Sequence, residues 1–189
     1  VRTMDFEQGV REGKILYIPE KLTDDYLNRV SKEAFQPEGI DKNVAIVYTP
    51  LNGAGLHCVT RILKENGYTN ISVVKELLAN DPDCDRVGTA VRDGDRYRLI
   101  SGNEMGVLLF DYICQMRTQK GTMPKNPVAV KTIVTTEMAA KVAEAYGVEL
   151  RNVLTGFKFI GVQIGLLEKE GHAERYIWGF EESYGYLSG

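Results

Sequence analysis

Hydrophobic positions in the first half of the chain alternate between short β-branched runs and helical repeats. Residues 44–48 and 71–74 are apolar runs typical of strands buried in a sheet. Between them a glycine-containing loop leads into a helical pattern that continues to Leu63 and closes at Gly67. An earlier amphipathic helix is predicted over 24–35. The pattern predicts a strand, loop, helix, strand order.

The second half repeats this alternation after a predicted hairpin over 87–100. Its turn is expected at Asp93-Gly94, because Asp-Gly between β-rich flanks is a favoured two-residue turn. Asn103 is the predicted N-cap of the helix that follows. The pattern then predicts strands over 127–135, 149–154 and 175–180, and helices over 103–116, 136–146 and 159–169.

Strands that alternate with helices in this way indicate parallel pairing, because parallel neighbours need a crossover connection. The sequence therefore predicts an α/β fold of two small domains with mostly parallel sheets and flanking helices. We place the boundary near Ile100, which gives domains 1–100 and 101–189.

The region around Glu76 and Leu77 conflicts with this topology. A strand-like run over 71–75 passes directly into another over 77–79, whereas parallel neighbours need a connection of roughly a dozen residues. Either one long strand runs through this region, or residues are absent and the first domain is incomplete at 76–77. We expect the second. The Cα atoms of Glu76 and Leu77 should then lie well beyond the roughly 3.8 Å that separates neighbours across a trans peptide bond.

The composition is that of an ordinary globular protein, with 43% hydrophobic and 26% charged residues and a net charge of −3. No basic nucleic-acid footprint, membrane-spanning run or signal-peptide layout is present in the sequence. Three widely spaced cysteines suggest neither a disulfide framework nor a zinc site. We expect a cytoplasmic protein without nucleic-acid or membrane partners. Because the chain starts at Val1, we also expect a piece of a longer protein.

Three carboxylates alternate directly after an apolar run, at Asp81, Asp83 and Asp85. Like charges this close raise one another's pKa unless a cation lies among them. Oxygen ligands of this kind suit Mg²⁺. An EF-hand is excluded because its glycine position holds Arg86. A solvated acidic turn and an Asp-x-Asp phosphatase remain open on this segment alone.

Six segments resemble, in order, motifs of the α-D-phosphohexomutase family of phosphoglucomutases and phosphomannomutases. Thr-Pro-Leu-Asn-Gly-Ala-Gly over 49–55 departs from the family pattern at Asn52 and Ala54, and Asp-Pro-Asp-Cys-Asp-Arg over 81–86 departs at Cys84. The others are 101–106, 131–136, 154–161 and 179–185. The resemblance covers nearly the whole chain, implies the second and third domains of such an enzyme, and is nearest to the phosphoglucomutase branch.

The resemblance also implies a set of functional residues. Metal ligands would be Asp81, Asp83 and Asp85, and substrate-binding residues would be Glu181, Ser183, Lys158, Lys131 and Arg86. The aspartates would hold Mg²⁺ against a seryl phosphate. Glu181 and Ser183 would hydrogen-bond sugar hydroxyls, while the two lysines would lie near the sugar or its phosphate.

Family members interconvert hexose 1-phosphate and hexose 6-phosphate through a phosphoserine and a hexose 1,6-bisphosphate intermediate. Neither the Ser-His-Asn-Pro motif of the first domain nor the Arg-x-Ser-Gly-Thr motif of the fourth is present in the sequence. We therefore assign no catalytic residue here, and expect the first and fourth domains as partners. The chain alone is expected to bind without turnover, and a non-catalytic binding module is the alternative.

Overall fold

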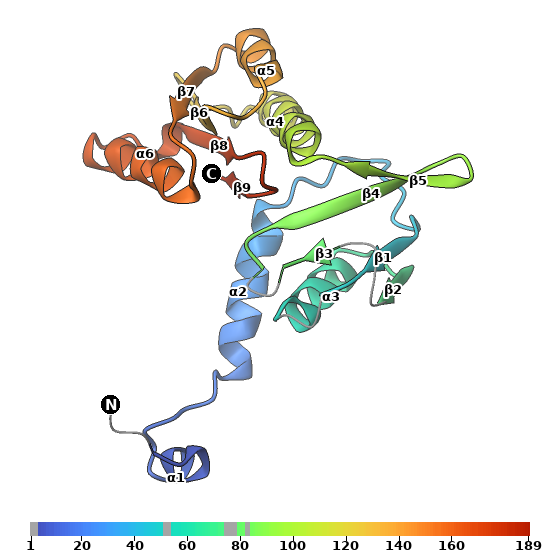
Figure 1. The fold of residues 1–189 in the computed structure, drawn as a ribbon, viewed down its shortest axis with the longest axis vertical. Coiled ribbons are helices and arrows are strands. Elements are labelled where there is room, and N and C mark those ends of the chain that lie inside the picture. The colour runs from blue at the N-terminus through green and yellow to red at the C-terminus, as the bar shows by residue number, and fades with distance from the viewer. Residues whose placement is uncertain (1–3, 51–53, 74–78, 82–83) are drawn as a thin grey trace.

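The computed structural model of the chain describes residues 4–50, 54–73, 79–81 and 84–189. Its helices are α1 (Phe6–Arg11), α2 (Glu20–Glu33), α3 (Gly55–Glu65), α4 (Gly102–Gln119), α5 (Met138–Tyr146) and α6 (Phe157–Lys169), with a 3₁₀ turn at Ala173–Arg175 (Figure 1). Its strands are β1 (Ile46–Tyr48), β2 (Ile71–Val73), β3 (Ala79–Asn80), β4 (Val87–Asp93), β5 (Arg96–Ile100), β6 (Val128–Thr132), β7 (Glu149–Val153), β8 (Tyr176–Phe180) and β9 (Tyr186–Ser188). The predicted α/β class is confirmed.

The strands form three small sheets. β1 and β2 are parallel, and β3, β4 and β5 form an antiparallel sheet. The third sheet has the order β7-β6-β8-β9, in which β6 is parallel to both neighbours and β9 is antiparallel to β8. The expected parallel pairing is therefore present, and antiparallel pairing occurs in addition where a short connection links two consecutive strands. The domain boundary near Ile100 stays a prediction.

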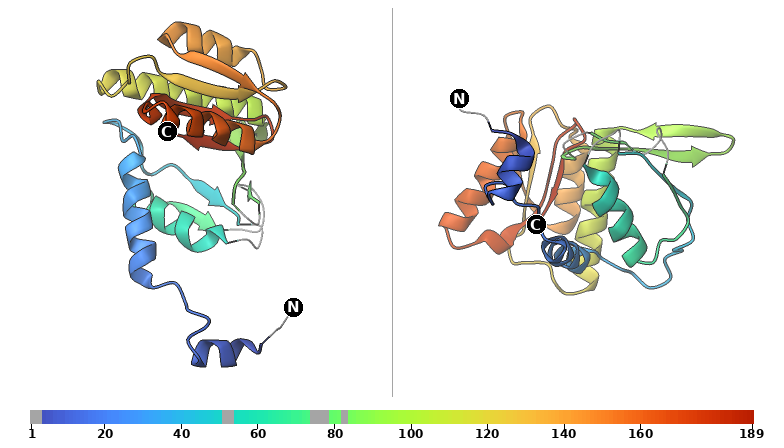
Figure 2. Two further views of the ribbon diagram at one scale, coloured as in Figure 1. Left: turned by 90° about the vertical axis from the view of Figure 1, so that its left-hand side faces the viewer. Right: turned by 90° about the horizontal axis from the view of Figure 1, so that it is seen from below.

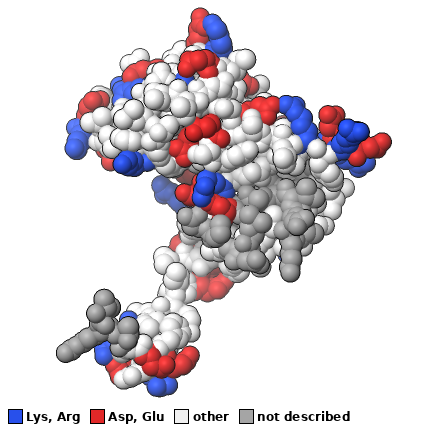
Figure 3. Space-filling model, viewed as in Figure 1, with Lys and Arg blue, Asp and Glu red and all other residues white. Residues whose placement is uncertain are grey.

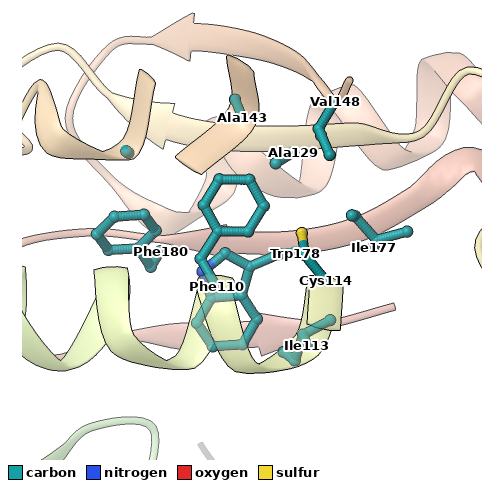
Figure 4. Packing of buried hydrophobic residues seen from close by; sticks show 10 residues of the cluster. Phe110, Ile113, Cys114, Ala129, Ala143, Val148, Ile177, Trp178 and Phe180 are labelled. Atoms are coloured by element: carbon teal, nitrogen blue, oxygen red, sulfur yellow. The ribbon is translucent and has the colours of Figure 1, made fainter. Parts of the chain in front are cut away.

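The third sheet is covered on both faces, because successive side chains of a strand point to opposite sides. Ala129 of β6 packs with Phe110 and Cys114 of α4 in one core (Figure 4). The neighbouring Val130 packs with Ile160 of α6 in a second core. Burial on both faces explains why β6 reads as a continuous apolar run.

Several predicted boundaries need correction. Ser101, not Asn103, caps α4: its side chain accepts from the Glu104 amide, and the Glu104 carboxylate accepts from the Ser101 amide. The strand predicted over 127–135 ends at Thr132, because the Thr135 amide donates to Thr132 O at 3.0 Å and forms a turn.

The predicted hairpin is confirmed, but its turn lies one residue later. Asp93 pairs with Arg96, so Gly94 and Asp95 form the loop, and Gly94 takes the positive φ of +59° that glycine tolerates. Helix α1, set apart from the rest of the chain in Figures 1 and 2, was not predicted, nor was the three-residue β9. No helix among the described residues is long and apolar enough to cross a membrane.

Gly106 is predicted to tolerate no larger side chain. A Cβ there would overlap the buried Phe180 ring, whereas a Cβ at Gly161 of α6 would meet nothing within 4 Å. Gly106→Ala should lower the free energy of unfolding by about 1–3 kcal/mol through overpacking. Gly161→Ala should raise it by roughly 0.5–1 kcal/mol. Urea denaturation measures the free energy of unfolding of both variants. Equal effects of the two substitutions would contradict the close packing of Gly106 against Phe180.

Cys114 should make stability depend on alkaline pH. The side chain is fully buried, and burial raises its pKa from 9.0 to about 12. Between these values the thiol ionises only in the unfolded chain, so its contribution is intact below pH 9 and is lost as pH rises toward 12. Relative to Cys114→Val, the chain should lose about 1.4 kcal/mol per pH unit in this window. Parallel stability curves for both proteins would contradict this.

Candidate functional site

The loop between β8 and β9 carries the two residues predicted to hold a sugar. β8 and β9 pair Phe180 with Tyr186, so the residues between them form a hairpin loop. The Glu181 amide donates to Gly185 O at 3.0 Å and closes this loop. The Ser183 hydroxyl donates to Glu181 Oε1 at 2.8 Å. The structure brings these two side chains together at the carboxyl end of β8.

Three parallel strands end along the same edge of this sheet. β6 ends at Thr132, β7 at Val153 and β8 at Phe180, and all three run in one direction. Open α/β sheets bind ligands at the carboxyl ends of their strands. The β6–α5 turn, the start of α6 and the β8–β9 loop therefore share the edge where a ligand is expected.

The two predicted lysines differ in their surroundings. The Lys131 side chain is fully buried, and its Nζ donates to Thr135 O and to the Glu137 carboxylate, both at 2.9 Å. Lys158 is exposed in the first turn of α6, with its Nζ 5.0 Å from the centre of the Phe159 ring. Charges of both signs are interspersed on the face drawn in Figure 3. Lys158 alone of this pair is available to a dissolved anion.

The acidic loop folds around the Arg86 side chain. The Arg86 Nε lies 2.7 Å from Asp81 Oδ2 and 3.3 Å from Asp85 Oδ1. The Arg86 amide also donates to Asp81 Oδ1 at 3.1 Å, and the Cys84 amide donates to Asp81 O at 3.0 Å. Cys84 has a φ of 63°, which turns the loop back on itself. Hydrogen bonds that the Arg86 guanidinium donates to Asp85 and Asp81 raise its pKa.

The predicted convergence of three carboxylates stays a prediction. Asp83 lies outside the described residues. Within the described ranges, no group of three His, Cys, Asp or Glu side chains is placed to hold a metal ion. Asp81 and Asp85 are nevertheless brought together, through the one guanidinium that both contact.

The acidic loop and the β8–β9 loop meet through their backbones. Arg86 and Gly185 form an antiparallel bridge, and the Val87 amide donates to Tyr184 O at 3.2 Å. The start of β4 accordingly lies beside the β8–β9 loop in Figure 1. This contact places the predicted metal loop next to the predicted sugar-binding pair.

The acidic loop also packs against the start of α3. An added Cβ at Gly55 would lie 2.5 Å from the Tyr48 hydroxyl and 3.0 Å from Cys84 Sγ. Tyr48 is buried, and desolvation, followed by the nearby Cys84, raises its pKa. The glycine at the end of the 49–55 segment is thus required by close approach of the acidic loop.

Sequence reasoning missed the part played by Glu182. Its Oε2 accepts from the hydroxyls of Thr132 at 3.0 Å and Thr135 at 3.3 Å. The two threonines, three residues apart at the end of a buried strand, were a usable signal, because a turn there brings their hydroxyls together. The partner carboxylate comes from the loop after β8, far away in the sequence, so only the fold identifies it.

Residues 101–189 match the family model described as phosphoglucomutase/phosphomannomutase, alpha/beta/alpha domain III. Across 97% of its length the chain is 32% identical to the phosphoglucomutase of Staphylococcus saprophyticus. Residues 101–189 therefore belong to the phosphoglucomutase/phosphomannomutase family, as its domain III.

Solved structures resemble the chain in fold. A Thermus thermophilus protein described as a phosphomannomutase matches 88% of the chain and 42% of its own, with a TM-score of 0.65 at 19% identity. The Aspergillus fumigatus N-acetylphosphoglucosamine mutase, solved with GlcNAc-6P and magnesium, matches 85% of this chain and 38% of its own. Its TM-score is 0.59 at 15% identity, so this likeness supports the fold alone.

The chain spans 39% of the length of its Staphylococcus saprophyticus relative. Their alignment extends over 222 residues while the chain has 189, so the difference, at least 33 positions of the relative, has no counterpart here. The join predicted at Glu76 and Leu77 lies outside the described residues and stays a prediction.

Proposed function

We propose that this segment supplies the metal loop and the sugar-binding loop of an enzyme that interconverts hexose 1-phosphate and hexose 6-phosphate. A phosphoserine elsewhere in that enzyme would form the hexose 1,6-bisphosphate intermediate, and the segment itself contributes no catalytic residue. The observation that carries the proposal is the backbone pairing of Arg86 with Gly185. It brings the acidic loop alongside Glu181 and Ser183.

The acidic loop fits a hard cation by its donor set. Asp81 and Asp85 offer only carboxylate oxygens, which Mg²⁺ prefers, and both already contact the positive Arg86. We infer that Asp81, Asp83 and Asp85 would hold Mg²⁺, which when bound would supply positive charge beside a transferring phosphoryl group. Arg86 would then leave the aspartates and bind a substrate phosphate.

The hairpin pair suits recognition of sugar hydroxyls. The Glu181 carboxylate accepts hydrogen bonds, and the Ser183 hydroxyl both donates and accepts. A mutase must bind its sugar in two orientations, so these groups would hydrogen-bond to hydroxyls that are presented in both orientations. Lys158 is exposed near the same edge and would bind a phosphate, while Lys131 is buried and would act on the site only through its own turn.

We also propose domains 1–100 and 101–189, since separate sheets lie before and after Ile100 and the family match begins at Ser101. The first and fourth domains, one of which would hold the phosphoserine, are the proposed partners.

The three cysteines are unpaired in the structure, which supports placement in the cytoplasm.

Metal binding is predicted to depend on the acidic loop. Titration with Mn²⁺ should saturate one site, and bound metal should slow alkylation of the partly exposed Cys84 relative to Cys58. Asp83→Asn should weaken binding by at least about tenfold, because it removes one ligand charge. Asp93→Asn, at the far end of β4, is the matched control. Binding that Asp83→Asn leaves unchanged would remove the site.

Sugar-phosphate binding is predicted to depend on Glu181. Glu181→Gln should weaken binding of glucose 1-phosphate by about 1–3 kcal/mol, since the hydrogen bonds to a charged acceptor are lost. Mannose 1-phosphate titrated in parallel reports the choice of hexose, and Glu168→Gln on α6 is the control. Binding that is unchanged in Glu181→Gln would remove Glu181 from the site. Release of inorganic phosphate from the sugar phosphate by the chain would favour the Asp-x-Asp phosphatase.

A further inference from the structure

The side chain of Glu182 is engaged away from the two residues that flank it. Its Oε2 accepts from the Thr132 and Thr135 hydroxyls, on the turn between β6 and α5. Glu181 and Ser183 instead bond to each other, and Ser183 is exposed. Glu182 therefore connects the β8–β9 loop to the β6–α5 turn. Glu181 and Ser183 are not used in that connection and stay available to the proposed ligand.

The two threonines form a buried, directional pair. Thr132 is 0% exposed and Thr135 is 3% exposed, and their hydroxyl oxygens lie 2.6 Å apart. Two hydroxyls supply two protons, and an ionised carboxylate only accepts. The Thr132 proton goes to Glu182 Oε2 at 3.0 Å, and the Thr135 proton is shared between that oxygen at 3.3 Å and the Thr132 hydroxyl at 2.6 Å, which satisfies all three groups.

The turn that presents these hydroxyls is itself fixed. The Lys131 Nζ, which is buried, donates to Thr135 O at 2.9 Å and to the Glu137 carboxylate at 2.9 Å. The Thr135 amide donates to Thr132 O at 3.0 Å. Both hydroxyls are therefore held at defined positions before any ligand arrives.

A separate element holds the backbone of Glu182. Helix α4 begins at Gly102, where an added Cβ would overlap Glu182 O and come within 2.9 Å of the Tyr184 amide nitrogen. This close approach leaves no room for the loop to move toward the helix. The side chain and the backbone of Glu182 are thus fixed by two different parts of the fold.

We propose that Glu182 is a positioning residue for sugar binding, held by Thr132 and Thr135 so that Glu181 and Ser183 are preorganised. It rests on the proposed function, because it assigns the ligand contacts to Glu181 and Ser183. Preorganised groups bind more tightly than groups that must first be ordered. Releasing Glu182 should therefore weaken binding without removing any group that touches the sugar.

Titration of the full chain with glucose 1-phosphate, followed by NMR, tests this. Thr132→Val has the same shape but no hydroxyl and should weaken binding roughly tenfold to a hundredfold. Thr132→Ser restores the hydroxyl and should bind within about twofold of the unaltered chain. Glu182→Gln should also weaken binding. Thr118→Val, on the exposed side of α4, is the matched control, and Mn²⁺ affinity should be unchanged in every variant.

Amide hydrogen exchange gives a second readout that needs no ligand. In Thr132→Val the Glu181 amide should exchange faster, while amides of β8 keep their protection. If Thr132→Val misfolds, Thr135→Val with the same two measurements replaces it.

The possible outcomes separate the two proposals. If the unaltered chain shows no saturable binding, the proposed function and this inference both fall. If binding depends on Glu181 but is unchanged in Thr132→Val and Glu182→Gln, only this inference falls. Equal weakening in Thr132→Val and Thr132→Ser would also overturn it, because the lost property would then be packing rather than the hydrogen bond.

Discussion

A backbone bridge between Arg86 and Gly185 ties together two loops that lie far apart in the sequence. Closing so long a loop costs conformational entropy, which the surrounding structure must offset. The bridge can form because the β8–β9 hairpin is short and closed by the Glu181 amide, and because β4 continues directly from the acidic loop. Its bonds are made by main-chain atoms, so it tolerates side-chain changes such as Cys84 in place of a small residue.

The ion pair between Arg86 and Asp85 at this junction is open to solvent. The Arg86 side chain is 52% exposed and that of Asp85 is 65% exposed, so solvent screens the pair. Exposed ion pairs of this kind contribute little to folding. The guanidinium also contacts the less exposed Asp81 at 2.6 Å and so keeps the repulsion between the two carboxylates low. A cation bound as proposed would have to replace Arg86 in that role.

Much of the fold, but less of the site, could be predicted from the sequence. The helix α4 and strands β6 and β8 were found because their apolar patterns are long and regular. Ser101 was passed over for Asn103 as the cap, although Ser-x-x-Glu at 101–104 is a readable capping box. Asn103 instead accepts from the Thr136 amide at 3.0 Å, a contact that depends on the tertiary fold.

Short elements were missed for a related reason. β9 has three residues and exists because β8 offers a free edge, so its pattern alone carries too little information. Glu181 and Ser183 were selected together through the family resemblance; the structure shows their side chains in contact, and their role in sugar binding stays a prediction. The use of Glu182 could not be foreseen, since its partners lie on β6 and the turn after it. Contacts between distant segments are where local pattern stops being informative.

Lys131 shows how the fold changes the meaning of a residue. The family resemblance implied that its charge faces the ligand. The structure leaves it 0% exposed, with the cost of burying an ammonium group offset by the Thr135 carbonyl and the Glu137 carboxylate. A lysine in that position can influence the site only by fixing the turn that carries Thr132 and Thr135. In the proposed function, the positive charge that meets a phosphate would therefore come from Lys158 or Arg86, which are exposed at the surface.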